Sequence, residues 1–229
     1  MKTTRWILLF IVILSAPAMA TAQYKAFSFG FKAAPGLGWL KTDTKGYTAG
    51  SSLSFSWGFV SEFNFSENYC IATGINFQFM NSKLTYPDLR TINGATETFV
   101  DRKLRVKYLQ IPFTLKMRTT EMNNMRFFGQ FGLGTGFRLN ATGKDEYTAQ
   151  TGGRIIETNN VDGEVSFFRE SMILGLGAEY RISSGNTLSV GLTFDNGFTD
   201  ILPKKNKFDT GLNPKATNSL LEVSIALMF

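Results

Sequence analysis

The sequence predicts an all-β fold, an eight-stranded antiparallel up-and-down β-barrel that crosses a membrane. Three observations lead to this prediction. Apolar and polar residues alternate with a period of two in eight segments of the 229-residue chain, as in strands whose two faces meet different surroundings. Most of these segments reach the roughly 9 to 11 residues that a tilted strand needs to cross a bilayer. The connections between them alternate between long and short, as in outer-membrane barrels.

Residues 1–22 have the features of a secretory signal peptide. Lys2 and Arg5 precede a short apolar run, and two Ala-x-Ala sites follow it, the second ending at Ala22. The apolar run is too short to cross a bilayer as a helix, which needs roughly 20 residues. We expect cleavage after Ala22, so that residues 23–229 form one outer-membrane β-barrel domain. Cleavage lowers the formal net charge from +6 to +4, and we infer no nucleic-acid partner from so small a charge.

Four strands are predicted in the first half of the chain. The apolar positions of the first three are Phe27, Phe29 and Phe31, then Leu53, Phe55, Trp57 and Phe59, then Tyr69, Ile71, Ile75, Phe77 and Phe79. The fourth strand covers residues 103–117, but its apolar positions change phase, from Leu104, Val106 and Tyr108 to Leu109, Ile111, Phe113 and Leu115. A β-bulge near Tyr108 or Pro112 would explain this change.

Four more strands are predicted in the second half. Their apolar positions are the odd residues from Met125 to Leu139, the even residues from Phe168 to Ile182, then Leu188, Val190, Leu192 and Phe194, and finally Leu221, Val223, Ile225, Leu227 and Phe229. Charged residues and glycines occupy the opposite face of these segments. Eight strands follow from the two halves together.

The connections between these strands give the expected orientation. Long connections are predicted at residues 41–51, 83–101, 141–164 and 199–218, and short turns at residues 66–68, 119–124 and 183–186. Because four long connections alternate with three short turns, both chain ends lie on the side of the short turns, and the number of strands is even. In outer-membrane barrels that side is periplasmic, so we expect periplasmic termini and extracellular long connections.

Aromatic residues supply two further expectations. Phe229 ends the last alternating strand, and a terminal aromatic residue in that place resembles the insertion signal that the barrel-insertion machinery of Gram-negative bacteria reads. Trp39, Trp57, Tyr69 and Tyr180 are outward residues near the predicted strand ends. There they would form, with Phe229, the aromatic girdles of a membrane barrel.

The inward faces of the strands carry both signs of charge. The predicted lumen network comprises Lys32, Glu62, Arg126, Arg138, Arg169, Glu179, Arg181, Asp195 and Glu222. An eight-stranded barrel is too narrow for an aqueous channel, and pairing lowers the cost of burying charges. The network is therefore interpreted as a plug and scaffold, with a gated pore as the weaker alternative. Gly132, Gly134 and Gly136 are interpreted as small inward residues of the same lumen and not as a phosphate-binding loop, because no helix follows them.

Residues 107–117, Lys-Tyr-Leu-Gln-Ile-Pro-Phe-Thr-Leu-Lys-Met, resemble the characteristic strand of the PorT-like outer-membrane barrel family. Residues 127–136, 175–181 and 197–201 follow it with the spacing of that family. The resemblance covers the whole mature chain and implies an eight-stranded outer-membrane barrel. Some relatives are linked to a protein-secretion apparatus, and no catalytic residue carries over. Gln110 replaces the residue that is usually acidic in this motif, which puts a charge-based role for the site in doubt.

The composition argues against several kinds of chemistry. The chain contains no histidine, the usual general base of outer-membrane lipases, acyltransferases, deacylases and proteases. With Cys70 as the one cysteine, the sequence offers no zinc-ligand set and no intramolecular disulfide. An acid/base pair of Asp195 and Glu222 is far less expected than their structural pairing. We therefore predict no enzymatic activity, no catalytic or metal-binding residue and no cofactor.

Three functions remain open at this point. The first is a structural or interaction barrel whose long connections meet an extracellular protein or a secretion complex. The second is a small channel or transporter, because the inner face is polar. The third is a soluble periplasmic lipid-binding barrel, whose apolar face would line a cavity. Expected partners are outer-membrane lipid and lipopolysaccharide, the latter through Lys204, Lys205 and Lys207, although a merely solvated loop is favoured there.

Overall fold

A computed structural model describes residues 25–88, 98–148, 153–202 and 214–229. Nine strands and one short helix form in this part of the chain: β1 (Phe27–Thr42), β2 (Thr48–Asn64), β3 (Tyr69–Asp88), β4 (Thr98–Arg118), β5 (Met125–Thr148), β6 (Arg154–Asn160), the 3-10 helix η1 (Asp162–Glu164), β7 (Phe168–Arg181), β8 (Thr187–Gly197) and β9 (Ala216–Met228). The predicted signal peptide, residues 1–22, lies outside the described residues, as do Lys204, Lys205 and Lys207.

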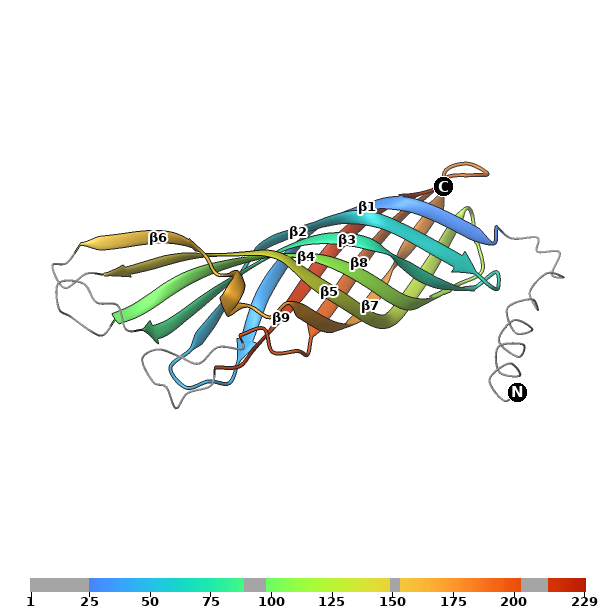
Figure 1. Cartoon of the computed structure of the whole chain (residues 1–229). Helices are drawn as coiled ribbons and strands as arrows, with labels where there is room; N and C mark the ends of the chain where they lie inside the picture. The colour runs from blue at the N-terminus through green and yellow to red at the C-terminus, as the bar shows by residue number, and fades with distance from the viewer. Residues whose placement is uncertain (1–24, 89–97, 149–152, 203–213) are drawn as a thin grey trace, which may run out of the picture.

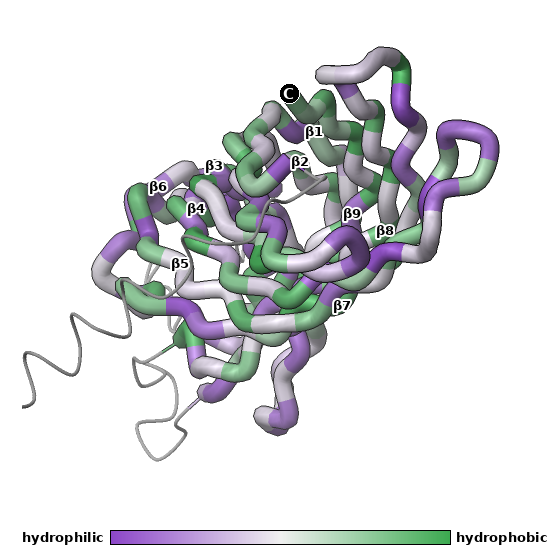
Figure 2. The backbone as a smooth tube through the Cα atoms, turned by 90° about the vertical axis from the view of Figure 1, so that its right-hand side faces the viewer, coloured by the Kyte–Doolittle hydropathy of each residue, from purple (hydrophilic) through white to green (hydrophobic). Residues whose placement is uncertain are grey.

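Eight of the nine strands close into a barrel, which confirms the predicted fold class. Each strand pairs antiparallel with its neighbour in the order β1, β2, β3, β4, β5, β7, β8 and β9, and β9 returns to pair with β1. The ring is visible from one end in Figure 2. The ninth strand, β6, lies outside the ring and pairs with β5. Among the described residues, no helix is long and apolar enough to cross a membrane.

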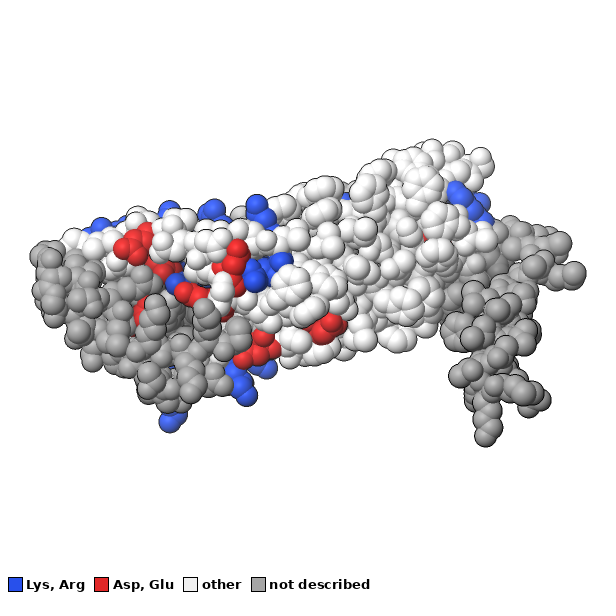
Figure 3. Space-filling model, in the orientation of Figure 1, with Lys and Arg blue, Asp and Glu red and all other residues white. Residues whose placement is uncertain are grey.

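A belt of exposed apolar side chains surrounds one half of the barrel. We call it the apolar belt; on β4 it consists of the outward residues Leu109, Ile111, Phe113, Leu115 and Met117. These positions span nine residues of β4, close to the roughly 9 to 11 residues of a transmembrane strand. In Figure 3 this half is almost free of charged side chains, whereas charges gather on the other half. Outward apolar residues are the opposite of what a soluble lipid-binding barrel would show.

The two ends of the barrel differ in their connections. Short turns join β2 to β3, β4 to β5 and β7 to β8, as predicted, and the start of β1 and the end of β9 lie at this short-turn end (Figure 1). Between β4 and β5, Asn123 and Asn124 both have positive φ. Met122 and Met125 exchange two backbone hydrogen bonds of 2.9 Å across them. Asparagine tolerates this left-handed conformation, which a tight two-residue hairpin turn requires.

At the opposite end, which we call the hairpin end, strands replace much of the predicted loop structure. Residues 141–164 are predicted as a long loop, but β5 continues to Thr148 and β6 and η1 follow. β3 and β4 likewise extend into residues 83–88 and 98–101. The long connections therefore project from the barrel as a sheet of β3, β4, β5 and β6 (Figure 1). We call this projecting sheet the extension.

The phase change in residues 103–117 has a different cause from the one predicted. β4 keeps a strict alternation, with Leu104, Val106 and Tyr108 buried inside. A register shift does occur between Lys107 and Tyr108, but the additional residue is Leu139 on β5. Along β4 the apolar side thus changes from the inner to the outer face, because the strand begins in the extension and then enters the apolar belt. In the extension the inside is an apolar core and the outside is polar.

Inward glycines make room for neighbouring backbone and for lumen side chains within the belt. A Cβ atom on Gly132 would lie 2.1 Å from the backbone oxygen of Phe113, and one on Gly134 would lie 2.6 Å from the side-chain nitrogen of Gln110. Both positions agree with the interpretation of this glycine series as small lumen residues. Within the described residues, the series lies in β5 and is followed by η1, which is three residues long.

The aromatic girdle is only partly as expected. Tyr69 begins β3 and Tyr180 is the second-last residue of β7. Trp39 stacks on Phe194 with ring centroids 5.9 Å apart. Trp57, however, lies in the middle of β2 and stacks on Phe77. Its placement near a strand end is therefore wrong, because β2 extends beyond the segment that alternation alone defines.

Candidate functional site

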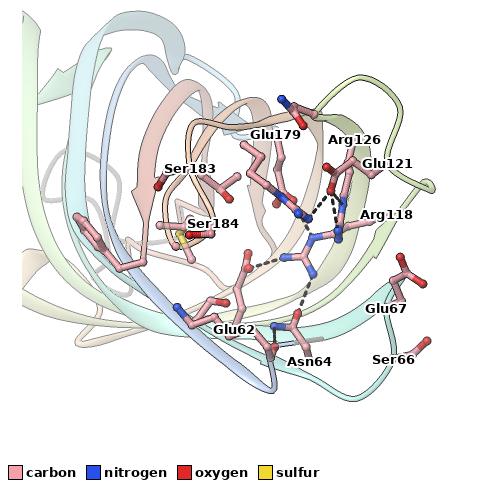
Figure 4. A pocket seen from close by; sticks show the side chains of 18 residues that line it. Glu62, Asn64, Ser66, Glu67, Arg118, Glu121, Arg126, Glu179, Ser183 and Ser184 are labelled. Carbon is pink, nitrogen blue, oxygen red and sulfur yellow. Dashed lines mark hydrogen bonds and ion pairs between the residues drawn. The ribbon is translucent and has the colours of Figure 1, made fainter. Parts of the chain in front are cut away.

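The lumen opens into a pocket at the short-turn end. This mouth pocket has a volume of about 870 Å³ and is lined by both signs of charge, including Lys25, Glu62, Arg118, Glu121, Arg126 and Arg181 (Figure 4). Glu121, from the turn between β4 and β5, accepts hydrogen bonds from Arg126 and also pairs with Arg181. The rim of the pocket is therefore held by ion pairs between neighbouring strands.

Four paired charges close the inner end of the mouth pocket. We call Glu62, Lys116, Arg118 and Glu179 the lower charge cluster. Lys116 Nζ lies 2.7 Å from Glu62 Oε1 and 2.5 Å from Glu179 Oε1, and Arg118 bonds both carboxylates as well. Two cations thus face two anions, and all four side chains are at most 7% exposed. Every charge has two partners of opposite sign, which burial demands.

One side of the lower charge cluster is packed against an aromatic ring. Lys116 Nζ lies 4.1 Å from the ring centroid of Phe128, close enough for a cation–π interaction. Phe128 is itself buried and points inward from β5. Apolar surface therefore covers one side of these ion pairs.

A second cluster fills the middle of the lumen. We call Gln78, Gln110, Arg169, Asp195 and Asn218 the middle polar cluster. Asp195 accepts hydrogen bonds from Arg169 (2.7 Å), Gln78 (3.1 Å) and Gln110 (2.6 Å). Arg169 Nε also donates to Asn218 Oδ1 over 2.5 Å. These residues come from β3, β4, β7, β8 and β9, so the cluster ties opposite walls of the barrel together.

An apolar core closes the lumen toward the hairpin end. It includes Leu40, Met80, Leu104, Val106, Tyr108 and Leu220, which are all buried. Beyond it, Arg102 forms a bidentate pair with Asp145, at 2.6 and 2.7 Å, and a further bond to Glu164 at 2.5 Å. Charge pairing and apolar packing therefore alternate along the whole interior of the described barrel.

η1 is fastened to the barrel wall by Asp162. Its carboxylate accepts hydrogen bonds from the Ala141 amide (2.5 Å), the Asn160 side chain (2.9 Å) and Arg138 (2.7 Å). The bond from Asn160, with the other two donors, holds the pKa of the Asp162 carboxyl below its usual range. Val161 and Val165 on either side are buried in the apolar core, so η1 covers that core.

The structure divides the nine predicted lumen residues among several places. Glu62 and Glu179 belong to the lower charge cluster, and Arg169 and Asp195 to the middle polar cluster. Lys32 pairs with Glu222 at 3.3 Å. The remaining three lie apart, with Arg138 bonded to Asp162 and with Arg126 and Arg181 at the rim of the mouth pocket. The side chain of Arg181 is 44% exposed, so the nine residues do not form one network.

The partners that the sequence reasoning missed come mostly from β4. Lys116, Arg118 and Gln110 all share one face of this strand. The apolar run at positions 109, 111, 113 and 115 already places the even residues inward, so alternation alone could have found them. Asn218 and Asp145 carried no such indication, because they lay in segments predicted as loops.

The residues weighed for metal and acid/base chemistry are all buried: Cys70, Asp195 and Glu222. Across the described ranges, no group of three or more Cys, Asp or Glu residues is placed to hold a metal ion. Cys70 is buried in β3. Asp195 and Glu222 each face a cation, Arg169 and Lys32, at 2.7 and 3.3 Å. The arrangement is that of internal ion pairs in a filled lumen.

Comparison with known proteins places the chain among membrane barrels. The model of a family described as outer membrane protein beta-barrel domain matches residues 19–203. No curated protein matches the chain. The fold is similar to that of Neisserial surface protein A, at 11% identity and a TM-score of 0.45, covering 89% of this chain and 96% of that one. A major outer membrane protein from Thermus thermophilus is similar at 13% identity and 0.46, covering 90% and 100%.

Proposed function

The chain belongs to the outer membrane protein beta-barrel domain family, and on that premise we propose that it is a closed, non-enzymatic barrel that presents its extension to a protein partner. Outer-membrane localisation follows from the family. The single observation that carries the proposed role is the contrast between a filled lumen and a projecting sheet. The transmembrane half is sealed by paired side chains, whereas β3, β4, β5 and β6 continue beyond the apolar belt.

The proposed orientation has the short-turn end in the periplasm. Short turns and both chain ends on one side are typical of the periplasmic side of such barrels. The extension would then stand outside the cell. Phe229 lies at the short-turn end, where its backbone exchanges two hydrogen bonds with Phe29. We assign it to recognition by the barrel-insertion machinery, and its ring contact with Phe29, at 5.8 Å between centroids, supports a role in closing the barrel.

Conduction is the alternative that the filled lumen disfavours. Opening a path through the lower charge cluster would separate ion pairs that are almost fully buried, and breaking one such pair by removing a partner costs roughly 3–5 kcal/mol. The apolar core lies above it in series. Purified protein in planar bilayers should therefore show no unitary conductance, and discrete channel openings would favour the transporter hypothesis over ours.

The extension is suited to a protein partner. Most residues of β6 are exposed, and Ile156 and Thr158 face outward, with Ile156 51% exposed. Within the described residues, β6 pairs on one side only, with β5, and an open strand edge can accept a further strand. The resemblance of residues 107–117 to PorT-like barrels supports a partner from a protein-secretion apparatus.

Site-specific photo-crosslinking in intact cells tests this role. A photoreactive side chain at Ile156 or Thr158 should yield a crosslinked protein, identified by mass spectrometry. The same group at Leu133, whose side chain is exposed within the apolar belt, is the matched control and should yield lipid adducts only. A secretion component in the adduct would support the secretion role. Absence of any protein adduct along β6 would overturn the proposal.

A further inference from the structure

Three lysines lie side by side on the outer face of the extension. Lys83 of β3 is directly opposite Lys103 of β4, and Lys103 is directly opposite Lys144 of β5. Arg105 and Lys107 continue the same outer face of β4 toward the membrane. We call these five residues the basic patch. Like charges directly opposite each other destabilise a sheet, so this arrangement lowers the stability of the folded chain.

No carboxylate of the described residues forms an ion pair with the basic patch. None of the ion pairs within the described residues involves Lys83, Lys103, Arg105, Lys107 or Lys144. The acidic residues of the next row away from the membrane, Asp101 and Glu146, have closer partners, and Glu146 also interacts electrostatically with Lys103 and Lys144. Asp101 accepts a hydrogen bond from Thr85 at 2.5 Å, and Glu146 pairs with Arg154. Four uncharged residues on the adjacent strands lie directly opposite residues of the patch: Asn81, Asn140, Thr142 and Thr158.

The height of the basic patch is set by the apolar belt. Leu109 is the belt residue of β4 nearest the hairpin end, and Lys107 is the next outward-facing residue of β4 in that direction. Lys107 also lies opposite Phe79, with its Nζ 5.6 Å from the centroid of that ring. The cations therefore begin where the apolar surface ends, which in a membrane barrel is the level of the lipid headgroups. The patch belongs to the hairpin end of the barrel.

We propose that the basic patch binds the phosphate groups of lipopolysaccharide in the outer leaflet. A phosphate monoester carries a charge of about −1.5 to −2 near neutral pH and accepts charge-assisted hydrogen bonds from lysine and arginine. Three lysines on adjacent strands, with Arg105 and Lys107 beside them, can bind more than one such group at once. A lipid headgroup, and not a soluble anion, is indicated because the patch is continuous with the apolar belt. The proposal relies on the hairpin end being extracellular.

Binding of purified lipopolysaccharide to the full mature chain in uncharged detergent tests the proposal. The probes are intact lipopolysaccharide, the same material after enzymatic dephosphorylation, and heparin as a soluble polyanion. The variant is the triple substitution Lys83→Gln, Lys103→Gln and Lys144→Gln. Its matched control is Lys41→Gln, Lys45→Gln and Lys215→Gln, which removes three exposed lysines from the β1, β2 and β9 side of the barrel. Heat-dependent gel mobility verifies that each variant is folded.

We expect the patch variant to bind intact lipopolysaccharide at least about tenfold more weakly at low ionic strength, since each cation near an anionic surface adds to binding. Dephosphorylation should weaken binding by the unaltered chain to a similar extent. The control variant should change binding by less than about twofold. Equal binding by the patch variant, or insensitivity to dephosphorylation, would overturn the proposal. Heparin that displaces lipopolysaccharide completely would also overturn it and assign the patch to a soluble acidic partner. These outcomes do not depend on the crosslinking of β6.

Discussion

Arg169 illustrates how single charged residues are accommodated in the barrel. Its side chain is fully buried, and it bonds Asp195 at 2.7 Å and Asn218 at 2.5 Å. The guanidinium also lies 5.9 Å from the ring centroid of Tyr108. Removing one partner would leave a buried charge with too few contacts, whereas removing both ions would not. The stability of the lumen therefore depends on keeping each buried charge beside an opposite charge.

Replacing Asp195 tests this dependence. Asp195→Ala should lower the free energy of unfolding by roughly 3–5 kcal/mol, because Arg169 would remain buried and charged. The double substitution Arg169→Met and Asp195→Leu should recover most of the loss. Urea unfolding in detergent or lipid measures both. As a control on the same strand, Asn196→Ala removes one hydrogen bond, from Ser219, and should cost about 1 kcal/mol. An equal loss in Asp195→Ala and Asn196→Ala would contradict the argument.

Asp162 predicts a pH dependence at the hairpin end. Hydrogen bonds from Asn160, Ala141 and Arg138 depress the pKa of this carboxyl. A depressed pKa means that the ionised form stabilises the folded state above the ordinary aspartate pKa of about 3.9, and that this stabilisation is lost as the pH falls through the folded pKa.

Hydrogen exchange at the Ala141 amide checks this prediction. The protection factor of that amide, corrected for the intrinsic exchange rate, should fall on acidification from neutral pH to below the folded pKa of Asp162. In Asp162→Asn the protection should be lower at neutral pH and should lack this acid transition. Identical pH profiles in the two proteins would rule out Asp162 as the responsible group.

At the scale of elements, β5 shows why particular glycines are required. Gly132 faces inward where the backbone of β4 is so close that a Cβ atom would lie 2.1 Å from Phe113 O and 2.6 Å from Thr114 Cα. Backbone atoms cannot move aside as the end of a flexible side chain can. Gly129 on the same strand has no heavy atom within 4 Å of an added Cβ.

The two glycines therefore predict opposite results. Gly132→Ala should destabilise the barrel by roughly 1–3 kcal/mol through overpacking. Gly129→Ala should leave stability unchanged or raise it by up to about 1 kcal/mol, because alanine restricts the unfolded chain. Equilibrium unfolding of both variants in the same lipid measures the difference. A loss in Gly129→Ala as large as that in Gly132→Ala would show that the close approach at Gly132 is not the cause.

β4 also shows how far the sequence predicts the structure. Alternation located the strand and its belt face, because both depend on neighbours two residues apart. The same alternation places Lys116 and Arg118 inward, although the predicted lumen network did not include them. It misattributed the phase change at Tyr108 to a bulge in this strand, because a period of two does not reveal whether lipid or protein lies on a given side. It also missed β6, since a hairpin that stands outside the belt need not alternate: β6 reads Arg-Ile-Ile-Glu-Thr-Asn-Asn.

The middle polar cluster was beyond the reach of the sequence for a different reason. Its members come from five strands that are distant in sequence, and the contacts depend on the register around the closed ring. Arg169 and Asp195 could be placed inside the barrel, but their particular partners could not be assigned. Two lumen side chains can pair only if they lie at the same level along the barrel axis. Alternation within a single strand does not give that level.

At the scale of the whole molecule, β4 passes through two environments. Phe113, at the centre of its belt segment, is 63% exposed, and Phe99, on the same outer face within the extension, is 67% exposed. The two residues have similar exposure in the isolated chain. Phe113, however, lies within the apolar belt and should contact lipid, whereas Phe99 lies beyond the belt and should contact water. A matched pair of substitutions on one strand can therefore distinguish the two surroundings.

Arginine at these two positions should have unequal effects. Phe113→Arg should cost roughly 2–4 kcal/mol of folding free energy in lipid vesicles, the value for a cation at the bilayer midplane, whereas Phe99→Arg should cost less than about 1 kcal/mol. The fraction of protein that folds into vesicles, followed by heat-dependent gel mobility and urea titration, provides the measurement. Equal costs at both positions would place the membrane elsewhere on the barrel.

The pairing of β1 with β9 has a consequence for how the molecule is made. Gly30 pairs with Met228, so the two strands that complete the ring are the first and the last of the chain and lie far apart in sequence. Contacts between such remote segments form slowly, and until they form, the first and last strands each have backbone amides and carbonyls open to strands of other molecules. We therefore expect the newly exported polypeptide to require a carrier protein that covers the unpaired edges of β1 and β9 until the barrel is inserted. Without such a carrier, self-association should compete with ring closure.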